Sequence, residues 1–255
     1  MEWSLWGLIF LVGAVIGSFL NVCIYRIPLD LSIIRPGSSC PACKTAIAPY
    51  DNVPILSFLL LFGRCRKCRA PISWRYPLVE LLNGLGYLLL VWMFGLDVTS
   101  LVYAIFYSAL LVVTFIDIDY QIIPDVITYP GIVLGIGLSV FLPVGIVDSL
   151  IGFLVGGGLF YLVAEASLRI LKQDGMGGGD IKLIAMIGAF LGWQSVLLTI
   201  FLSSLGGALL GGAFMLIKGW GRKTPIPFGP FLALGAIIAM FWGAPIMEWY
   251  VGLSQ

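Results

Sequence analysis

Two aspartate-bearing segments carry the residues best suited to chemistry in this sequence. Asp117, Asp119 and Asp125 lie together in one segment, and Asp180 follows the glycine-rich stretch 175–179. Both segments border apolar runs, where an ionisable side chain is costly and is therefore a functional candidate by default. Two carboxylates about 3 Å apart share one proton, so one can take a proton from water while the other donates to a carbonyl oxygen. A pair drawn from these two segments would hydrolyse peptide bonds.

Position along a helix separates the four aspartates. Asp119 is two residues from Asp117 and therefore points away from it on a helix, so the two are not expected in one cavity. Asp125 follows a proline and precedes an apolar run, which favours a helix N-cap. The alternative for Asp180 is also a cap, with residues 175–179 as a plain linker. Glu80 lies within an apolar span, and its partner is not predicted.

Three glycines precede Asp180, namely Gly177, Gly178 and Gly179. Because they lack a Cβ atom, a peptide backbone can come close to them and the loop can bend. Irregular backbone at membrane depth also requires a water-lined cavity. We therefore expect this loop to admit the substrate. Other small-residue spacings, Gly152/Gly156 and Gly207/Gly211, are typical of close helix packing.

Four of the five cysteines form two close pairs. The pattern is Cys40-Pro-Ala-Cys43, then 21 residues, then Cys65-Arg-Lys-Cys68. This spacing is typical of the two knuckles of a tetrahedral zinc ribbon, and four protein ligands leave no open position, so the predicted zinc is structural. The alternative is a set of reduced thiols in two turns. Cys23 stands alone and is interpreted as a packing residue.

Composition removes several classes of function. The chain has 255 residues, no histidine, 60% hydrophobic and 11% charged residues, and a net charge of +1. Without histidine, a Ser-His or Cys-His protease and an H-E-x-x-H metalloprotease cannot be built. The charge balance gives no reason to expect a nucleic-acid partner. The hydrophobic content indicates a membrane protein with lipid as its surroundings.

Eight apolar runs predict an all-α polytopic membrane protein with about eight transmembrane helices. They cover residues 3–24, 77–96, 99–116, 126–146, 147–171, 181–192, 194–217 and 227–252. The first is expected to be a retained helix, since no cleavage site follows it. With both termini outside, all 14 Lys and Arg residues fall on the inner side, as the positive-inside rule requires.

The predicted organisation has three parts. Residues 1–25 form the first transmembrane helix, residues 26–76 a small cytosolic zinc-ribbon domain, and residues 77–255 a transmembrane protease core. A domain of about 50 residues rarely supports its own fold with an apolar core, and a bound metal is a common remedy.

The sequence resembles the bacterial type IV prepilin peptidases, which are bifunctional leader peptidases and N-methyltransferases. The resemblance runs nearly end to end. It rests on Gly17-Ser-Phe-Leu-Asn-Val22 with Tyr25-Arg-Ile-Pro28, the paired cysteines, Ile72-Ser-Trp-Arg-Tyr-Pro77 with Val79-Glu80, Ile116-Asp117 through Pro124-Asp125, and Gly177-Gly-Gly-Asp180-Ile-Lys182. The last of these contains the G-x-G-D signature of intramembrane aspartyl proteases.

This resemblance implies that Asp117 and Asp180 are the catalytic pair, and it selects Asp117 over Asp119. It also implies cleavage of a short basic leader from prepilins or type II secretion pseudopilins, after a glycine and at the cytosolic face of the bacterial inner membrane. Methylation of the new N-terminus by S-adenosylmethionine follows from it too. The zinc-ribbon domain is associated with that step in the family, but no methyl-donor contacts are implied.

Two other classes of function remain open from the residues alone. An ion- or proton-coupled transporter uses membrane aspartates and broken helices, although such proteins usually contain repeated halves and none is found here. A noncatalytic assembly factor would use the zinc ribbon to recruit a partner. Ion flux in proteoliposomes without peptide cleavage would favour the transporter, and intact function with asparagine at both aspartates would favour the assembly factor.

Overall fold

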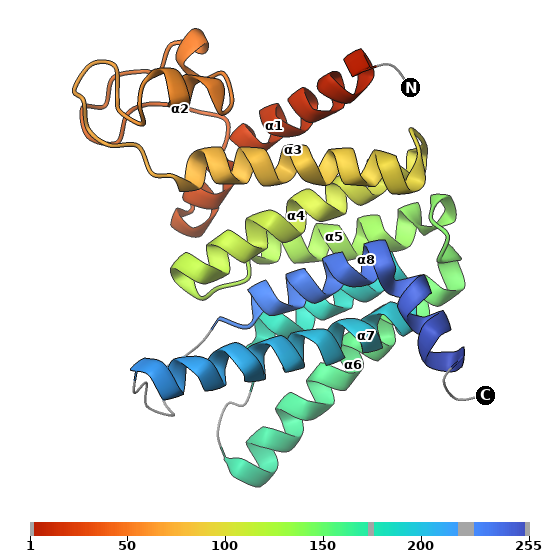
Figure 1. The fold of residues 1–255 in the computed structure, drawn as a ribbon. Coiled ribbons are helices and arrows are strands. Elements are labelled where there is room, and N and C mark those ends of the chain that lie inside the picture. The colour runs from red at the N-terminus through yellow and green to blue at the C-terminus, as the bar shows by residue number, and fades with distance from the viewer. Residues whose placement is uncertain (1–2, 173–175, 219–226, 253–255) are drawn as a thin grey trace. The chain divides into compact units, whose positions relative to one another are not determined.

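The computed structural model describes residues 3–172, 176–218 and 227–252 of the chain (Figure 1). The chain divides into two compact units, residues 1–112 and residues 113–255, and the division falls within helix α4. Outside residues 27–74, the described residues are mostly helical, and the described part of the chain contains no strand beyond two isolated bridges in the cysteine-rich segment.

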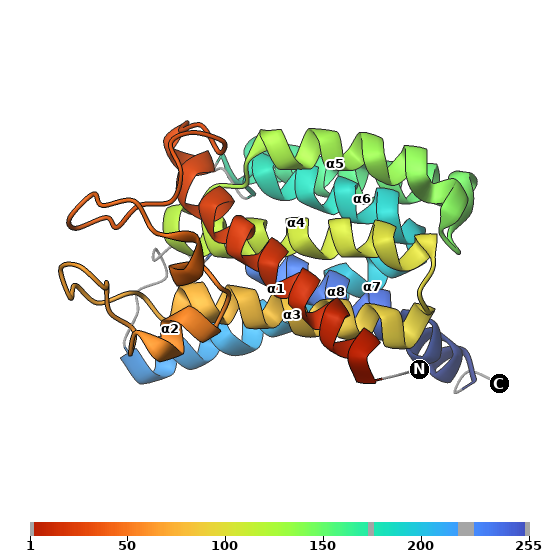
Figure 2. The same cartoon turned by 90° about the horizontal axis from the view of Figure 1, so that it is seen from above.

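The first unit is built on two long helices that lie side by side. They are α1 (Trp3–Arg26) and α3 (Arg75–Phe94), followed by most of α4 (Val98–Tyr120) (Figures 1 and 2). Between α1 and α3 lies a 48-residue insert, residues 27–74, whose helices are short: η1 (Ile27–Leu29), η2 (Pro49–Asp51) and α2 (Leu56–Leu60).

Glycines allow α1 and α3 to approach closely. A Cβ at Gly13 would lie 2.9 Å from the Cα of Gly84, and one at Gly17 would lie 2.7 Å from the Cα of Glu80. Polar side chains cross the same interface, because Asn83 Nδ2 donates to the Gly13 carbonyl at 2.7 Å and Asn21 Nδ2 donates to a carbonyl of α3. Small residues and interhelical hydrogen bonds are the usual adhesion between helices in lipid.

The second unit contains the end of α4 and four further long helices. These are α5 (Asp125–Leu138), α6 (Gly145–Ala166), α7 (Gly178–Lys218) and α8 (Gly229–Gly252), with the short turns η3 (Ser139–Phe141) and η4 (Ser167–Leu171). The expected close packing at Gly152 and Gly156 is confirmed, since a Cβ there would lie 2.4 Å and 2.7 Å from carbonyl oxygens of α7.

Helix α7 reverses its direction at Gly192, where φ is 78° and ψ is 172°. A Cβ at Gly156 would lie 2.7 Å from the Ile184 oxygen and 3.4 Å from Val196 Cγ1. Ile184 and Val196 would be about 18 Å apart along a straight helix. Because both lie close to Gly156, the chain folds back between them. The predicted break between residues 192 and 194 is confirmed, and only glycine adopts this φ without strain.

Contacts then fix the direction of each segment. The first half of α7 runs parallel to α5, since Gly131 faces Met186 and Gly135 faces Ala189, and antiparallel to α6. The second half runs antiparallel to α8, with Ser195 facing Gly243 at one end and Gly207 facing Phe228 at the other. The second unit is therefore a bundle of alternating helices.

Among the described residues, six helices are long and apolar enough to cross a membrane, with α7 taken as a single helix. Helix α5, at 14 residues, is shorter than the usual crossing length of about 20 residues. The structure thus establishes a polytopic all-helical protein, in agreement with the sequence prediction of class, while the count of eight crossings stays a prediction.

Candidate active site and metal centre

Asp117 lies on the last turns of α4 and is only 5% exposed. Its Oδ2 atom accepts a hydrogen bond from the backbone N–H of Gly229, the first residue of α8, at 2.9 Å. A Cβ at Gly229 would lie 2.7 Å from the same oxygen. The absence of a side chain at Gly229 therefore lets the helix terminus reach the carboxylate.

Asp180 lies in the first turn of α7 and is half-buried, and its N–H donates to the Gly177 carbonyl at 3.1 Å. The Asp117 and Asp180 carboxylates are close enough for their charges to interact. The structure thus brings together, within one unit, the two aspartates that the sequence analysis paired. Asp119 is exposed, in agreement with its predicted orientation away from Asp117.

The three glycines before Asp180 have different surroundings. Gly177 lies against the Asp180 carboxylate, since a Cβ there would be 3.1 Å from Oδ2. A Cβ at Gly179 would meet the side chain of Ile123 at 2.8 Å, whereas nothing lies within 4 Å of the position at Gly178. Asp174 and Gly175 lie outside the described residues. Access by a substrate therefore stays a prediction for this loop.

The prediction of Asp125 as an N-cap is wrong. Asp125 is the first residue of α5, the cap position is Pro124, and no side chain caps the helix. Instead the Asp125 carboxylate forms an ion pair with Lys182, whose ammonium also lies 5.3 Å from the centre of the Tyr129 ring. A cation two residues beyond Asp180 offered the carboxylate a stronger partner than backbone N–H groups. The pair ties the start of α5 to the start of α7.

The four cysteines of the insert gather at one point. The sulfur atoms of Cys40, Cys43, Cys65 and Cys68 all lie within 4.8 Å of one another, and those of Cys40 and Cys68 are 3.8 Å apart. Zinc–sulfur bonds of about 2.3 Å in a tetrahedron require sulfur separations of about 3.8 Å. The residues therefore fit a zinc ion.

The two knuckles have the same backbone geometry. Cys40 N–H donates to the Thr45 carbonyl and Cys65 N–H donates to the Ala70 carbonyl, both at 2.9 Å. The residue after each second cysteine has a positive φ, 57° at Lys44 and 60° at Arg69. Each pair thus turns back on itself so that both sulfur atoms face inward, as metal knuckles require.

The free thiols do not ionise equally. Hydrogen bonds from Thr45 lower the pKa of Cys43 to about 6. Although the Ala70 N–H acts to lower it, desolvation and the neighbouring thiols raise the pKa of Cys68 to about 11. Four adjacent thiolates repel one another, and a divalent cation removes that repulsion.

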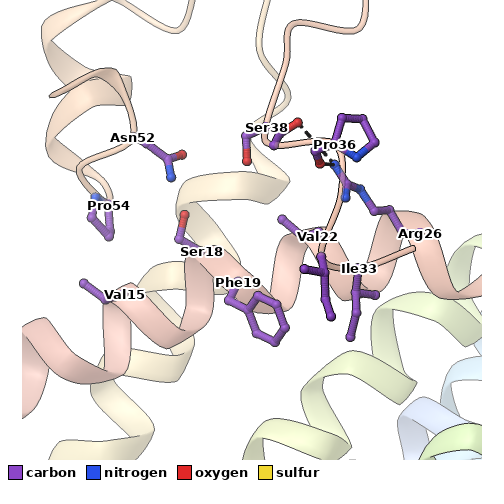
Figure 3. A pocket seen from close by; sticks show the side chains of 12 residues that line it. Val15, Ser18, Phe19, Val22, Arg26, Ile33, Pro36, Ser38, Asn52 and Pro54 are labelled. Atoms are coloured by element: carbon purple, nitrogen blue, oxygen red, sulfur yellow. Dashed lines mark hydrogen bonds between the residues drawn. The ribbon is translucent and has the colours of Figure 1, made fainter. Parts of the chain in front are cut away.

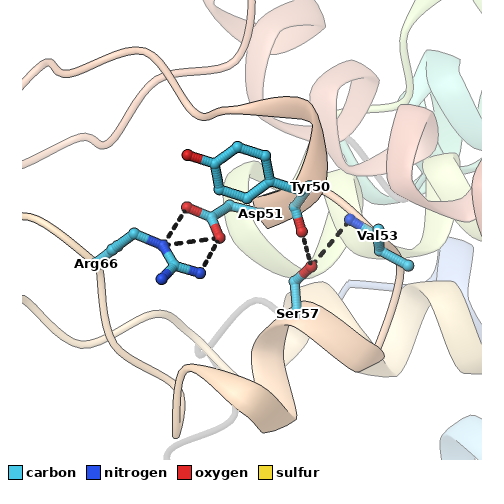
Figure 4. A network of polar contacts seen from close by, with 5 residues as sticks. All are labelled: Tyr50, Asp51, Val53, Ser57 and Arg66. Carbon is cyan, nitrogen blue, oxygen red and sulfur yellow. Dashed lines mark hydrogen bonds and ion pairs between the residues drawn. The ribbon is translucent and has the colours of Figure 1, made fainter.

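A polar network ties the second knuckle to the rest of the insert (Figure 4). The Arg66 guanidinium donates to both carboxylate oxygens of Asp51, at 2.6–3.0 Å, and this holds the pKa of Asp51 below its usual value. Ser57 Oγ donates to the Tyr50 carbonyl at 3.1 Å and accepts from Val53 N–H at 3.0 Å. These contacts stabilise loops that have little apolar core.

Sequence reasoning missed one residue next to the aspartates and did not predict the partners of another. Gly229 was not singled out, although a Gly-Pro step at the start of an apolar run is a signal for a helix N-terminus. Glu80 was left without a partner. Its Oε2 atom accepts from the backbone N–H of Ile55 at 2.7 Å, and its carboxyl also bonds to Ser18.

Two family models match successive parts of the chain. The bacterial peptidase A24 N-terminal domain matches residues 11–94, and the type IV leader peptidase family matches residues 104–212. A curated relative from Aeromonas hydrophila is 37% identical and covers 98% of this chain and 95% of its own length. One from Pseudomonas aeruginosa is also 37% identical, and the match covers 94% of this chain and 91% of the relative. One from Legionella pneumophila is 34% identical, and the match covers 98% of this chain and 96% of the relative.

All three relatives carry the name prepilin leader peptidase/N-methyltransferase. No solved structure matches the chain. With two aspartates converging in the segment that matches the peptidase and four cysteines in the segment that matches the N-terminal domain, this chain belongs to the type IV leader peptidase family.

Proposed function

We propose that this protein is a prepilin leader peptidase and N-methyltransferase. It cleaves the short basic leader of type IV prepilins or type II secretion pseudopilins after a glycine, and then methylates the new N-terminus with S-adenosylmethionine. Near end-to-end similarity to relatives named for both activities supports this assignment. No comparison favours the transporter.

Asp117 and Asp180 are the proposed catalytic pair. One carboxylate takes a proton from water, and the resulting hydroxide adds to the scissile carbonyl carbon, while the other carboxyl donates its proton to the carbonyl oxygen. Collapse of the tetrahedral intermediate breaks the C–N bond, and the leaving amine takes up a proton. The observation that carries this proposal is the convergence of the two carboxylates in one unit, one of them buried.

Zinc bound by Cys40, Cys43, Cys65 and Cys68 has a structural role in this proposal. The gathering of the four sulfur atoms within 4.8 Å of one another, with Cys40 and Cys68 3.8 Å apart, supports it. When bound, the ion would hold the two knuckles together without taking part in hydrolysis, because the four thiolates leave no open position for water.

The proposed setting is the bacterial inner membrane, crossed eight times, with both termini in the periplasm and the cysteine-rich insert in the cytosol. The reversal at Gly192 supports eight crossings, because it divides α7 into two antiparallel segments. The placement of Lys and Arg supports the orientation. Arg222 and Lys223, which contribute to that argument, lie outside the described residues.

The decisive experiment uses the purified full-length chain, a model prepilin and mass measurement of the mature N-terminus. We expect Asp117→Asn and Asp180→Asn each to reduce leader cleavage by at least about 10⁴-fold, because neither amide can take or give the proton. Asp119→Asn is the matched control and should cleave normally. Full cleavage by both single variants would remove the proposal.

A further inference from the structure

A cleft in the first unit lies between α1 and the insert (Figure 3). Its volume is about 260 Å³, and it is open on one side. Val15, Phe19 and Val22 of α1 form an apolar floor, and Ser18, Ser38 and Asn52 bring neutral polar groups toward the same space. An apolar surface with a few convergent polar groups is the usual composition of a small-molecule site.

Arg26 holds the loop that closes one end of this cleft. Its guanidinium donates to the Ser32 carbonyl at 2.8 Å and to the Pro36 carbonyl at 2.7 Å. Residues 32–38 are thereby fixed over the end of α1, although they belong to no regular element. The cleft is therefore a built feature of the fold, with both walls held in place.

A buried carboxylate that is not itself part of the cleft lining bonds to Ser18. Glu80 of α3 is 8% exposed, and the partners found for its carboxyl among the described residues are the N–H of Ile55 and the hydroxyl of Ser18, both neutral. Ser18 itself lines the cleft. Burying a carboxylate without a cation is costly, so an uncompensated acid next to a cleft favours a cationic ligand.

The functional groups of S-adenosylmethionine are complementary to the apolar floor, the neutral polar groups and the nearby carboxylate. Its sulfonium carries a positive charge, its adenine is a flat ring that can pack on Phe19, and its hydroxyl and amino groups can bond with Ser18, Ser38 and Asn52. The residues that line the cleft belong to the segment that matches the A24 N-terminal domain, and they lie outside the segment that matches the type IV leader peptidase family.

We infer that the cleft between α1 and the insert binds the methyl donor, with Glu80 supplying the negative charge that selects the sulfonium. The inference rests on the N-methyltransferase half of the proposed function. Glu80 is a specificity-determining residue in this scheme, since its charge separates the cationic donor from its neutral product, S-adenosylhomocysteine.

The test measures binding by equilibrium dialysis of the full-length protein against labelled S-adenosylmethionine and S-adenosylhomocysteine. Glu80→Gln keeps an oxygen that accepts from Ile55 and Ser18 but removes the charge. We expect this variant to raise the Kd for S-adenosylmethionine about tenfold. The Kd for S-adenosylhomocysteine should stay within about twofold of that of the unmodified protein. An equal effect on both ligands, or on neither, overturns the role of Glu80.

A second pair of variants tests the cleft independently of Glu80. Val22→Trp fills the space and should weaken both ligands about tenfold or more, whereas Val12→Trp, on an exposed part of α1 outside the cleft, should weaken neither. Ultraviolet cross-linking of the labelled donor should mark peptides containing residues 15–26 or 33–54. Cross-links confined to other peptides, or unchanged binding by Val22→Trp, would contradict the inference.

Zinc content and leader cleavage serve as folding controls for every variant. If the unmodified protein binds neither ligand, the methyltransferase assignment itself fails. If it binds both and the variants do not discriminate, only the location of the site fails.

Discussion

The insert of the first unit and the helical bundle of the second unit position their chemistry in opposite ways. In the insert, four clustered sulfur atoms that could hold one metal ion and the Arg66–Asp51 pair lie among loops that contain few regular elements. In the bundle, backbone meets backbone at glycines, as where a Cβ at Gly188 would lie 2.1 Å from the Gly152 oxygen. The insert therefore relies on a thiol cluster suited to a metal ion and on a few polar contacts, whereas the bundle relies on many close backbone contacts between its helices.

This difference predicts different sensitivities. The insert should fail when a ligand is lost and should tolerate changes in size elsewhere on its surface. The bundle should fail when volume is added at a helix crossing, even by one methyl group, since closely packed interiors cannot make room for it.

Removal of zinc should have the largest effect. Cys65→Ser, or chelation of the purified protein, is expected to reduce bound zinc from one ion per chain to none and to abolish methyl transfer, because metal binding supplies the folding free energy of so small a domain. Leader cleavage should fall by no more than about twofold. Metal analysis and methyl incorporation check this.

Cys23→Ala is the matched control, because Cys23 is buried in α1 and lies outside the cluster. It should retain zinc and both activities. Loss of cleavage in step with zinc would show that the two regions do not function separately.

Added volume at the tightest helix crossing should come second. Gly188→Ala places a methyl group against the α6 backbone, so we expect destabilisation by about 1–3 kcal/mol or more, with reduced cleavage. Thermal unfolding in detergent measures the change. Gly158→Ala is the control, because nothing lies within 4 Å of its Cβ position, and it should unfold at the original temperature.

Gly229→Ala should act on turnover more than on stability. Its methyl group would lie 2.7 Å from Asp117 Oδ2 and would displace the carboxylate, so kcat for cleavage should fall by about 10–100-fold while KM changes little. Steady-state kinetics with a model prepilin separate the two constants. Gly243→Ala, whose nearest neighbour would be 3.8 Å away, should behave as the original protein. A rise in KM at constant kcat would argue against a positioning role for Gly229.

The Lys182–Asp125 pair should have the smallest effect. Both side chains are partly exposed, at 27% and 55%, and such pairs are worth about 0–1 kcal/mol. A double-mutant cycle with Lys182→Met and Asp125→Asn, read out by cleavage rate, should give a coupling of no more than about fivefold. A much larger coupling would indicate that the pair helps to orient Asp180.

The sequence alone determined those features that depend on residue type and local spacing. Apolar runs long enough to cross a bilayer predicted helices, and the absence of histidine removed several protease mechanisms. The spacing of Cys40, Cys43, Cys65 and Cys68 predicted a metal centre, because two knuckles that close on one ion are set by short loops. The breaks between the apolar runs, including the one near Gly192, were likewise visible in the hydrophobicity pattern of the sequence.

Only the tertiary structure decided which distant groups meet. The backbone N–H of Gly229 donates to Asp117, although the two residues are 112 positions apart in the sequence. Asp125 forms an ion pair with Lys182 rather than capping its own helix. Glu80 receives a hydrogen bond from Ile55 in the insert. Such contacts depend on how helices cross and which backbone groups come within about 3 Å of each other. Neither periodicity nor motif spacing encodes that geometry, because each describes one segment at a time.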